Sequence, residues 1–230
     1  MIRRDYILRM LEEFFELLSR IRALLKGEKW NEAGLVVENS LQDLVGANLE
    51  TVTQLSETEL LARLIKGEPT LAVREKTLML ATLLKESGDI ATGQGRVEEG
   101  RSCYLKGLHL VLGVLAREEA FECPAFVPRV EAFLTGLDEA PLPLTTQAML
   151  MQHYERFGEF AKAEDALFSM IEAQPDNLEL LNFGVSFYHR LNDIGDQALT
   201  AGNLPRAELQ TGLAQLVARR DVETARQSRH

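Results

Sequence analysis

The chain has 230 residues, of which 46% are hydrophobic and 26% charged, and its formal net charge is −10. This apolar content is enough for a buried core. The acidic balance argues against nucleic acids and anionic membrane surfaces as partners, because both attract basic proteins. No apolar run approaches the roughly 18 residues of a membrane span, and acidic residues near the start interrupt any signal-peptide pattern. We therefore expect a cytoplasmic protein in which Cys103 and Cys123 are reduced, small buried side chains.

Apolar residues recur at helical spacing in almost every part of the sequence, and strand-like alternation does not occur. Glycine, proline and capping residues divide the helical stretches from one another. The expected helices, in chain order, cover about residues 4–26, 30–45, 57–65, 70–91, 97–116, 129–135, 144–156, 161–174, 178–199 and 204–218. The fold class is therefore predicted to be all-α.

The first expected helix, residues 4–26, carries a broad apolar face. Ile7, Leu11, Phe14 and Leu18 recur at spacings of four and three, and further apolar residues widen this stripe on both sides. So broad a face must be covered either by helices of the same chain or by a second copy of the protein. Both interpretations remain open, and the second would make these four residues the seam of a homodimer.

Two local signals divide the rest of the chain. Ser56 and Glu59 form a capping box, in which each side chain reaches the backbone of the other residue and opens a helix. Two prolines, Pro141 and Pro143, make residues 138–143 the best candidate for a linker. We expect an N-terminal helical region over residues 1–137, C-terminal hairpins over 144–218, and a frayed tail over 219–230.

A glycine turn followed by a small residue recurs four times. The stretches around residues 88–100 and 195–207 align without a gap, at an offset of 107 residues (195 − 88). The small residue is expected to let the second helix of each pair pack closely against the first. The four pairs of turn glycine and small residue are Gly27 with Ala33, Gly95 with Gly100, Gly158 with Ala163, and Gly202 with Ala207.

Residues 144–177 resemble a tetratricopeptide repeat, which has a length of about 34 residues. The residues that carry the resemblance are Leu150, Tyr154, Gly158, Phe160, Ala163, Leu167 and Pro175. Gln147, Met151 and Met170 depart from the family pattern. The resemblance implies antiparallel helical hairpins stacked as a right-handed α-α superhelix with irregular repeats.

The N-terminus resembles a bacterial family of uncharacterised repeat-like proteins. Members of that family open with an Arg-Asp-Tyr and an Arg-Met-Leu/Ile-Glu helix, which correspond to residues 4–6 and 9–12. This likeness implies a fold, and no activity comes with it.

The residues that commonly carry chemistry are not arranged in a recognisable motif. His109, His153, His189 and His230 are not spaced to share a metal ion, and the loop at residues 93–100 lacks the phosphate-binding pattern and follows a helix instead of a strand. We therefore expect a protein that is not an enzyme, with no catalytic, cofactor-binding or metal-binding residues. A helical enzyme or small-ligand binder, with a deep polar pocket, is the less favoured alternative.

The tetratricopeptide resemblance also implies a binding groove lined by the first helix of each hairpin. The groove positions that it implies are Thr145, Met149, Gln152, Glu155, Arg156, Asn182, Val185, Tyr188 and His189. An alternative is that Val185 and Tyr188 belong to the core and that the others are solvated. Arg156 and Arg190 could together bind a carboxylate. The expected function is a non-catalytic scaffold that binds a peptide or protein segment, and the alternative is a self-associating structural or regulatory protein.

Overall fold

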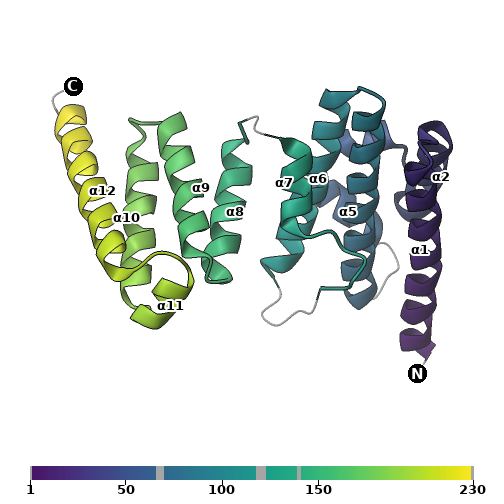
Figure 1. Ribbon diagram of the computed structural model, residues 1–230, viewed down its shortest axis with the longest axis horizontal. Helices are drawn as coiled ribbons and strands as arrows, with labels where there is room; N and C mark the ends of the chain where they lie inside the picture. Colours follow the sequence, from purple (N-terminus) through teal and green to yellow (C-terminus); the bar gives the residue numbers. More distant parts are fainter. Residues whose placement is uncertain (1, 66–69, 118–122, 139–140, 229–230) are drawn as a thin grey trace. The chain divides into compact units, whose positions relative to one another are not determined.

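The structure, a computed structural model, describes residues 2–65, 70–117, 123–138 and 141–228, and within these ranges it contains twelve α-helices and no strand. The helices form two compact units, Met1–Ala140 and Pro141–His230. The boundary between the units falls inside the proline-containing segment 138–143. Figure 1 shows the helices of each unit packed side by side.

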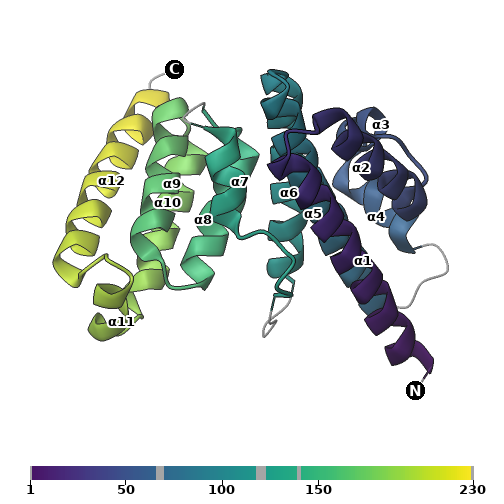
Figure 2. The same cartoon turned by 45° about the vertical axis from the view of Figure 1, so that its right-hand side comes forward.

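Unit 1 is arranged around one central helix, α5 (Thr70–Gly93), which packs most extensively against α6 (Val97–Leu115) and also against four further helices. These are α1 (Ile2–Lys26), α2 (Trp30–Val45), α4 (Glu57–Ile65) and α7 (Val130–Leu137), and a short α3 (Leu49–Gln54) lies against α6. Figure 2 shows α1 crossing in front of α5, with α2 beside it.

Because α5 is covered from several sides, it buries polar as well as apolar side chains. Thr77, Thr82 and Ser87 are at most 2% exposed, and each hydroxyl donates to the backbone carbonyl four residues earlier, at 2.7–2.8 Å. These bonds satisfy hydroxyl groups that would otherwise be costly to bury.

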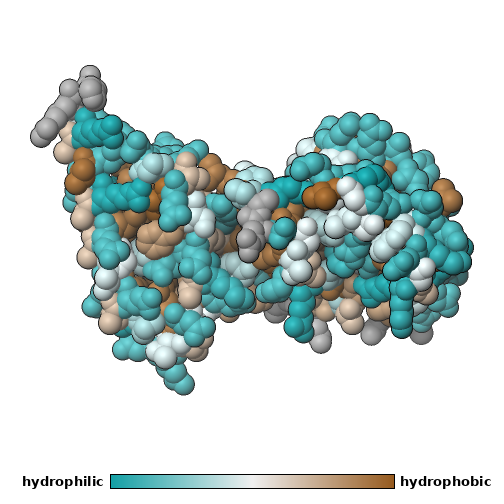
Figure 3. Space-filling model, turned by 45° about the horizontal axis from the view of Figure 1, so that its top comes forward, coloured by the Kyte–Doolittle hydropathy of each residue, from teal (hydrophilic) through white to brown (hydrophobic). Residues whose placement is uncertain are grey.

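Unit 2 consists of two helix pairs and a connecting turn. In the first pair α8 (Leu144–Arg156) packs against α9 (Phe160–Ala173), and in the second α10 (Leu178–Asn192) packs against α12 (Arg206–Gln227). The short α11 (Asp196–Ala201) connects α10 to α12. On the molecular face drawn in Figure 3, hydrophilic side chains predominate and apolar ones are scattered among them, as expected for a chain with many charged residues.

Three hairpin turns of the predicted repeat have the same backbone geometry. In each, one residue has positive φ and the next N–H donates to the carbonyl five positions earlier, which ends the first helix with a Schellman-type bond. The positive-φ residues are Glu28, Gly95 and Gly158, and the bonds are Lys29 to Leu24 (2.9 Å), Arg96 to Ala91 (2.8 Å) and Glu159 to Tyr154 (2.9 Å). The small residues that follow, Ala33, Gly100 and Ala163, are all buried.

The fourth turn of the repeat differs. Asn203 has positive φ and Leu204 donates to Leu199 at 3.0 Å, but Pro205 then delays the start of α12. Ala207 is consequently exposed, and the prediction that it mediates close helix packing is wrong. Gly212 takes that role, because a Cβ there would lie 2.3 Å from the hydroxyl oxygen of Tyr188.

Two helix boundaries differ from the sequence predictions. The helix expected over 178–199 breaks after Asn192, because Gly195 favours helix formation weakly and the guanidinium of Arg206 donates to the carbonyl of Asn192 at 2.9 Å. The tail expected to be frayed from residue 219 is helical as far as Gln227, where Glu223 is only 8% exposed.

One short helix was not predicted. α3 begins after Asn48, whose side-chain oxygen accepts from the Thr51 N–H at 2.9 Å, and this bond caps the helix.

Helical glycines set the close packing of unit 1, and we predict that they cannot be replaced freely. A Cβ at Gly88 in α5 would lie 2.4 Å from the Tyr104 ring, so Gly88→Ala should lower the free energy of unfolding by about 1–3 kcal/mol. Gly113 in α6 has no atom within 4 Å of such a Cβ, and Gly113→Ala should be neutral or stabilise by up to about 1 kcal/mol. Urea unfolding followed by the fluorescence of Trp30, the single tryptophan, reports on unit 1. Equal effects of the two substitutions would contradict this prediction.

Candidate functional site

A hollow of about 570 Å³ lies in unit 2 beside the turn between α8 and α9. Its volume is in the range of sites that bind small ligands or peptide side chains. Residues of α8, of the turn, of the start of α9 and of the end of α10 line it: Gln152, Glu155, Arg156, Gly158, Phe160, Arg190, Leu191 and Ile194. Phe160 and Leu191 are buried and give the hollow an apolar base, and the polar residues surround that base.

An ion pair between α8 and α10 forms one side of the hollow. The guanidinium of Arg190 donates from Nε to Glu155 Oε1 at 2.7 Å and from a terminal nitrogen to Oε2 at 2.8 Å. These two parallel bonds fix the orientation of both side chains, and they raise the pKa of Arg190. Arg190 is therefore engaged by Glu155 in this structure, so the predicted carboxylate site would need that pair to open.

The structure brings together only part of the predicted groove. Gln152, Glu155 and Arg156 line the hollow. Outside it, Thr145, Asn182 and His189 are exposed and Met149 is half-buried. Leu191 and Ile194, which also line the hollow, were missed because the sequence predicted an unbroken helix there. The Ile194-Gly195 pair was the available sign that the helix ends.

Tyr188 lies in the core and not on a groove, which corrects its predicted place, and Val185 is buried with it. The side chain of Tyr188 is 0% exposed, its ring packs on Gly212 of α12, and its hydroxyl donates to the carboxylate of Glu164 in α9. Burial raises the pKa of both Tyr188 and Glu164. Tyr188 thus ties α10 to its neighbours and is not accessible to a partner.

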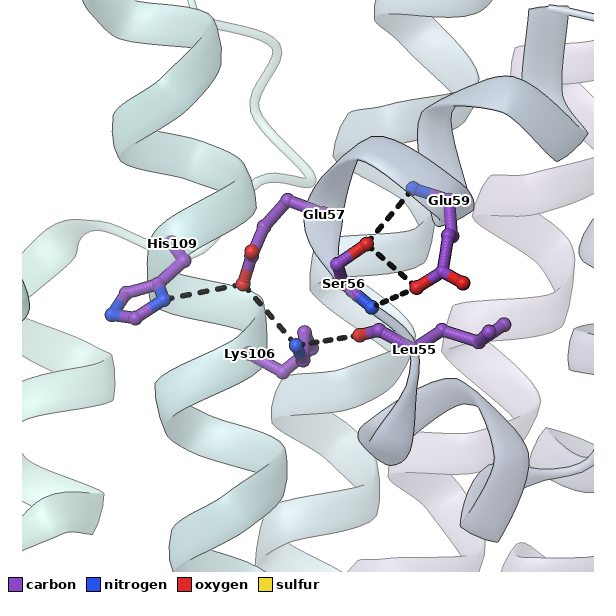
Figure 4. A network of polar contacts seen from close by, with 6 residues as sticks. All are labelled: Leu55, Ser56, Glu57, Glu59, Lys106 and His109. Carbon is purple, nitrogen blue, oxygen red and sulfur yellow. Dashed lines mark hydrogen bonds and ion pairs between the residues drawn. The ribbon is translucent and has the colours of Figure 1, made fainter.

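A polar cluster in unit 1 joins the start of α4 to α6. The carboxylate oxygen Oε1 of Glu57 lies 3.2 Å from Lys106 Nζ and 3.3 Å from His109 Nδ1, and Lys106 also donates to the carbonyl of Leu55 at 2.7 Å. Figure 4 shows both side chains of α6 pointing to this carboxylate. The sequence did not predict this cluster, because nothing in it shows that α4 packs beside α6.

The predicted capping box is present next to this cluster. The Ser56 N–H donates to Glu59 Oε2 at 2.8 Å and the Glu59 N–H donates to the Ser56 hydroxyl at 3.2 Å (Figure 4). The box fixes the first turn of α4 and thereby the position of Glu57.

The Glu57 carboxylate is held in its charged form. Partial burial opposes ionisation, but hydrogen bonds from its own backbone N–H, from Lys106 and from His109 together lower the pKa of Glu57 below its usual value of 4.5. Lys106 and His109 are 15% and 20% exposed in their side chains. The Lys106 ammonium contacts two protein oxygens, one on Leu55 and one on Glu57, so the cluster links the start of α4 to α6.

The two cysteines are free thiols that differ in exposure. Burial, with a contribution from Glu99, raises the pKa of Cys103 to about 12, so its thiol stays protonated. Cys123 is exposed, which corrects the prediction that it is buried, and partial desolvation and Glu75 raise its pKa. Among the residues with described positions, no three His, Cys, Asp or Glu side chains are grouped so that they could hold a metal ion.

Of the four residues predicted as a dimer seam, Ile7, Phe14 and Leu18 are buried within unit 1, and Leu11 is half-buried. Phe14 packs edge-on against Phe126, with ring centroids 5.2 Å apart. The centre of the apolar face of α1 is therefore covered by its own chain.

Comparison with known protein families places the chain in one of them. The sequence pattern of a family of unknown function, DUF6483, matches residues 1–221, which is nearly the whole chain. The chain belongs to the DUF6483 family. The predicted resemblance to an uncharacterised family agrees with this finding, whereas no tetratricopeptide family is matched. No curated protein and no solved structure is matched by this DUF6483 protein. None of the described helices is long and apolar enough to cross a membrane.

We predict that the Glu57 cluster makes stability depend on pH. The folded pKa of Glu57 is below 4.5, so its contribution is fully present above pH 4.5 and is lost as the pH falls through the folded value. Glu57→Gln should therefore lower the free energy of unfolding at pH 7 by about 1 kcal/mol, a modest value because the carboxylate is partly solvated. The difference from wild type should shrink in acid.

The matched control is Glu98→Gln, which changes an exposed carboxylate that also lies in the first turn of a helix. Urea unfolding monitored by Trp30 fluorescence at pH 7 and at about pH 4 gives both differences. A Glu57→Gln effect that is the same size at the two pH values, or no larger than that of Glu98→Gln, would show that the cluster does not act in this way.

Proposed function

We propose that this DUF6483 protein is a non-catalytic interaction scaffold, and that the hollow between α8 and α10 binds a segment of a peptide or protein. The observation that carries the proposal is the convergence of Gln152, Glu155 and Arg156 with Arg190 around an apolar base in one hollow of about 570 Å³. A buried apolar contact surrounded by hydrogen-bonding groups is the usual composition of a specific peptide site.

The local resemblance of residues 144–177 to a tetratricopeptide repeat supports the same proposal. In such repeats the first helix of each hairpin lines the binding surface, and here α8 and α10, the first helices of the two pairs, supply most of the lining. The turn between α8 and α9 has the expected Gly158 with positive φ. The proposed arrangement is tetratricopeptide-like in these hairpins, with irregular repeats elsewhere.

The Glu155–Arg190 pair would orient the partner and also limit what can bind. Its two short bonds place a carboxylate and a guanidinium at fixed positions, so a partner segment meets acceptors and donors that are already arranged. We propose binding without a chemical step, because the lining supplies a carboxylate, an amide and guanidinium groups that suit hydrogen bonding to a peptide.

The test uses a phage-displayed library of random 12-residue peptides and the purified full chain. We predict that selected peptides bind wild type and bind about 10-fold or more weakly to the double variant Gln152→Ala, Arg156→Ala, measured by fluorescence anisotropy. Loss of contacts and of hydrogen bonds in the hollow is the physical reason.

A matched double variant, Gln215→Ala with Arg219→Ala, removes the same residue types at the same spacing from exposed positions of α12 that do not line the hollow. Its affinities should equal those of wild type. If no peptide is enriched, or if both double variants bind equally well, the proposed function is wrong.

A further inference from the structure

The N-terminal half of α1 exposes apolar side chains that its own unit leaves uncovered. Tyr6, Leu8 and Phe15 are 40%, 50% and 44% exposed, so three of the large apolar side chains on the described surface lie within three turns of one helix. In Figures 1 and 2 the N-terminal turns of α1 extend past the other helices of unit 1. Clusters of this kind on a protein surface commonly mark an interaction site.

One edge of α1 borders a hollow of about 370 Å³ whose other walls are α2 and α5. Tyr6, Met10 and Leu17 form the α1 side, and Leu44, Met79 and Leu83 contribute apolar surface from α2 and α5. Phe126 lies against the opposite edge, where its ring centroid is 5.5 Å from that of Phe15. The side of α1 that carries Tyr6 therefore has a depression beside it, whose lining combines these apolar side chains with the polar residues Glu13, Ser40, Asp43 and Lys76.

The spacing along this edge is that of a helix that packs on another helix. Tyr6, Met10, Glu13 and Leu17 follow one another at intervals of four, three and four, the alternation found at the seam of paired helices. An α-helix laid along the hollow would contact α1 over its first three to four turns and would reach Leu44 of α2.

The charges on α1 select its own antiparallel copy as the partner. Arg9 and Glu16 stand beside the Tyr6 edge, seven residues apart (16 − 9), and both are exposed. In an antiparallel pair in which Leu17 faces Tyr6 of the other copy, Arg9 lies next to Glu16 of that copy. The two-fold axis repeats this opposite-charge pair.

A parallel pair is disfavoured by the same charges. It would place Glu13 of one helix directly beside Glu13 of the other in the seam, and like charges there destabilise helix pairing. Arg9 makes a long contact of 3.9 Å with the highly exposed Glu13, and exposed ion pairs of this kind contribute little, so the Arg9 guanidinium can turn to a second copy at little cost.

We propose that the protein forms a two-fold symmetric dimer in which the α1 helices of two copies pack antiparallel in the hollow between α1, α2 and α5. The seam consists of Tyr6, Met10, Glu13 and Leu17, flanked by Arg9 and Glu16, and in this register Glu13 lies opposite Met10 of the other copy. Ile7, Phe14 and Leu18, which are buried in the core of unit 1, lie on the neighbouring face of the same helix. This interface is independent of the peptide site proposed for unit 2.

The first experiment measures mass by sedimentation equilibrium at about 5–100 μM. We expect wild type to approach twice the monomer mass of 25.8 kDa, and Tyr6→Glu to weaken dimerisation about 10-fold or more while the helical circular dichroism stays unchanged. Leu35→Glu, the same kind of change at a 67% exposed residue of α2 outside the hollow, is the matched control and should dimerise like wild type.

A charge exchange tests the antiparallel register. Arg9→Glu alone and Glu16→Arg alone each place like charges together and should weaken the dimer, whereas Arg9→Glu combined with Glu16→Arg should restore it. Both residues are exposed, so these variants are expected to fold.

Three outcomes would overturn the proposal. A wild-type protein that is monomeric at 100 μM would mean that another molecule, or none, covers the hollow. If Tyr6→Glu does not weaken the dimer, the dimer interface lies on a different surface of the protein. Failure of the double charge exchange to restore a dimer that both single variants weaken would rule out the antiparallel register.

Discussion

Close approach of α5 and α6 is the contact on which the rest of unit 1 depends. Glycines at the crossing allow it: a Cβ at Gly107 would lie 3.0 Å from the backbone oxygen of Ala81, and one at Gly100 would lie 3.1 Å from that of Gly88. With the two helices this close, the Tyr104 ring lies directly on Gly88 in α5 and on Gly136 in α7. The pair therefore sets the position of α7 and leaves the other sides of α5 to α1, α2 and α4.

Unit 2 uses the same combination of an aromatic ring and a glycine, with different partners. Tyr188 packs on Gly212, and the carboxylate of Glu164 accepts from its hydroxyl. Gly184 of α10 is similarly enclosed, because a Cβ there would lie 2.5 Å from Leu216. These contacts hold α9, α10 and α12 together from the buried side, so that the polar ends of α8 and α10 are left to line the hollow.

Local chemistry explains what the sequence could predict. Helix 30–45, the capping box at Ser56 and the turns at Gly95 and Gly158 depend on residues close together in the chain, and their expected positions agree with the structure. Non-local packing explains the errors. Whether Tyr188 faces a groove depends on where α12 lies, and the break at Asn192 depends on a guanidinium from Arg206. The Glu57, Lys106 and His109 cluster likewise depends on two helices that are distant in the chain.

The repeated hairpin turn has a consequence for the order of folding. Each of the three matching turns joins helices through a very short loop, so little chain entropy is lost when α1 meets α2, α5 meets α6 or α8 meets α9. The contact of Phe14 with Phe126 joins parts of unit 1 that are far apart in the chain, and contacts of that kind are the slow ones. The hairpins should therefore assemble first and the docking of α1 last. Until that last step, the part of the α1 apolar face that α5 and Phe126 cover in the folded protein is open to solvent, which makes α1 prone to aggregation during folding.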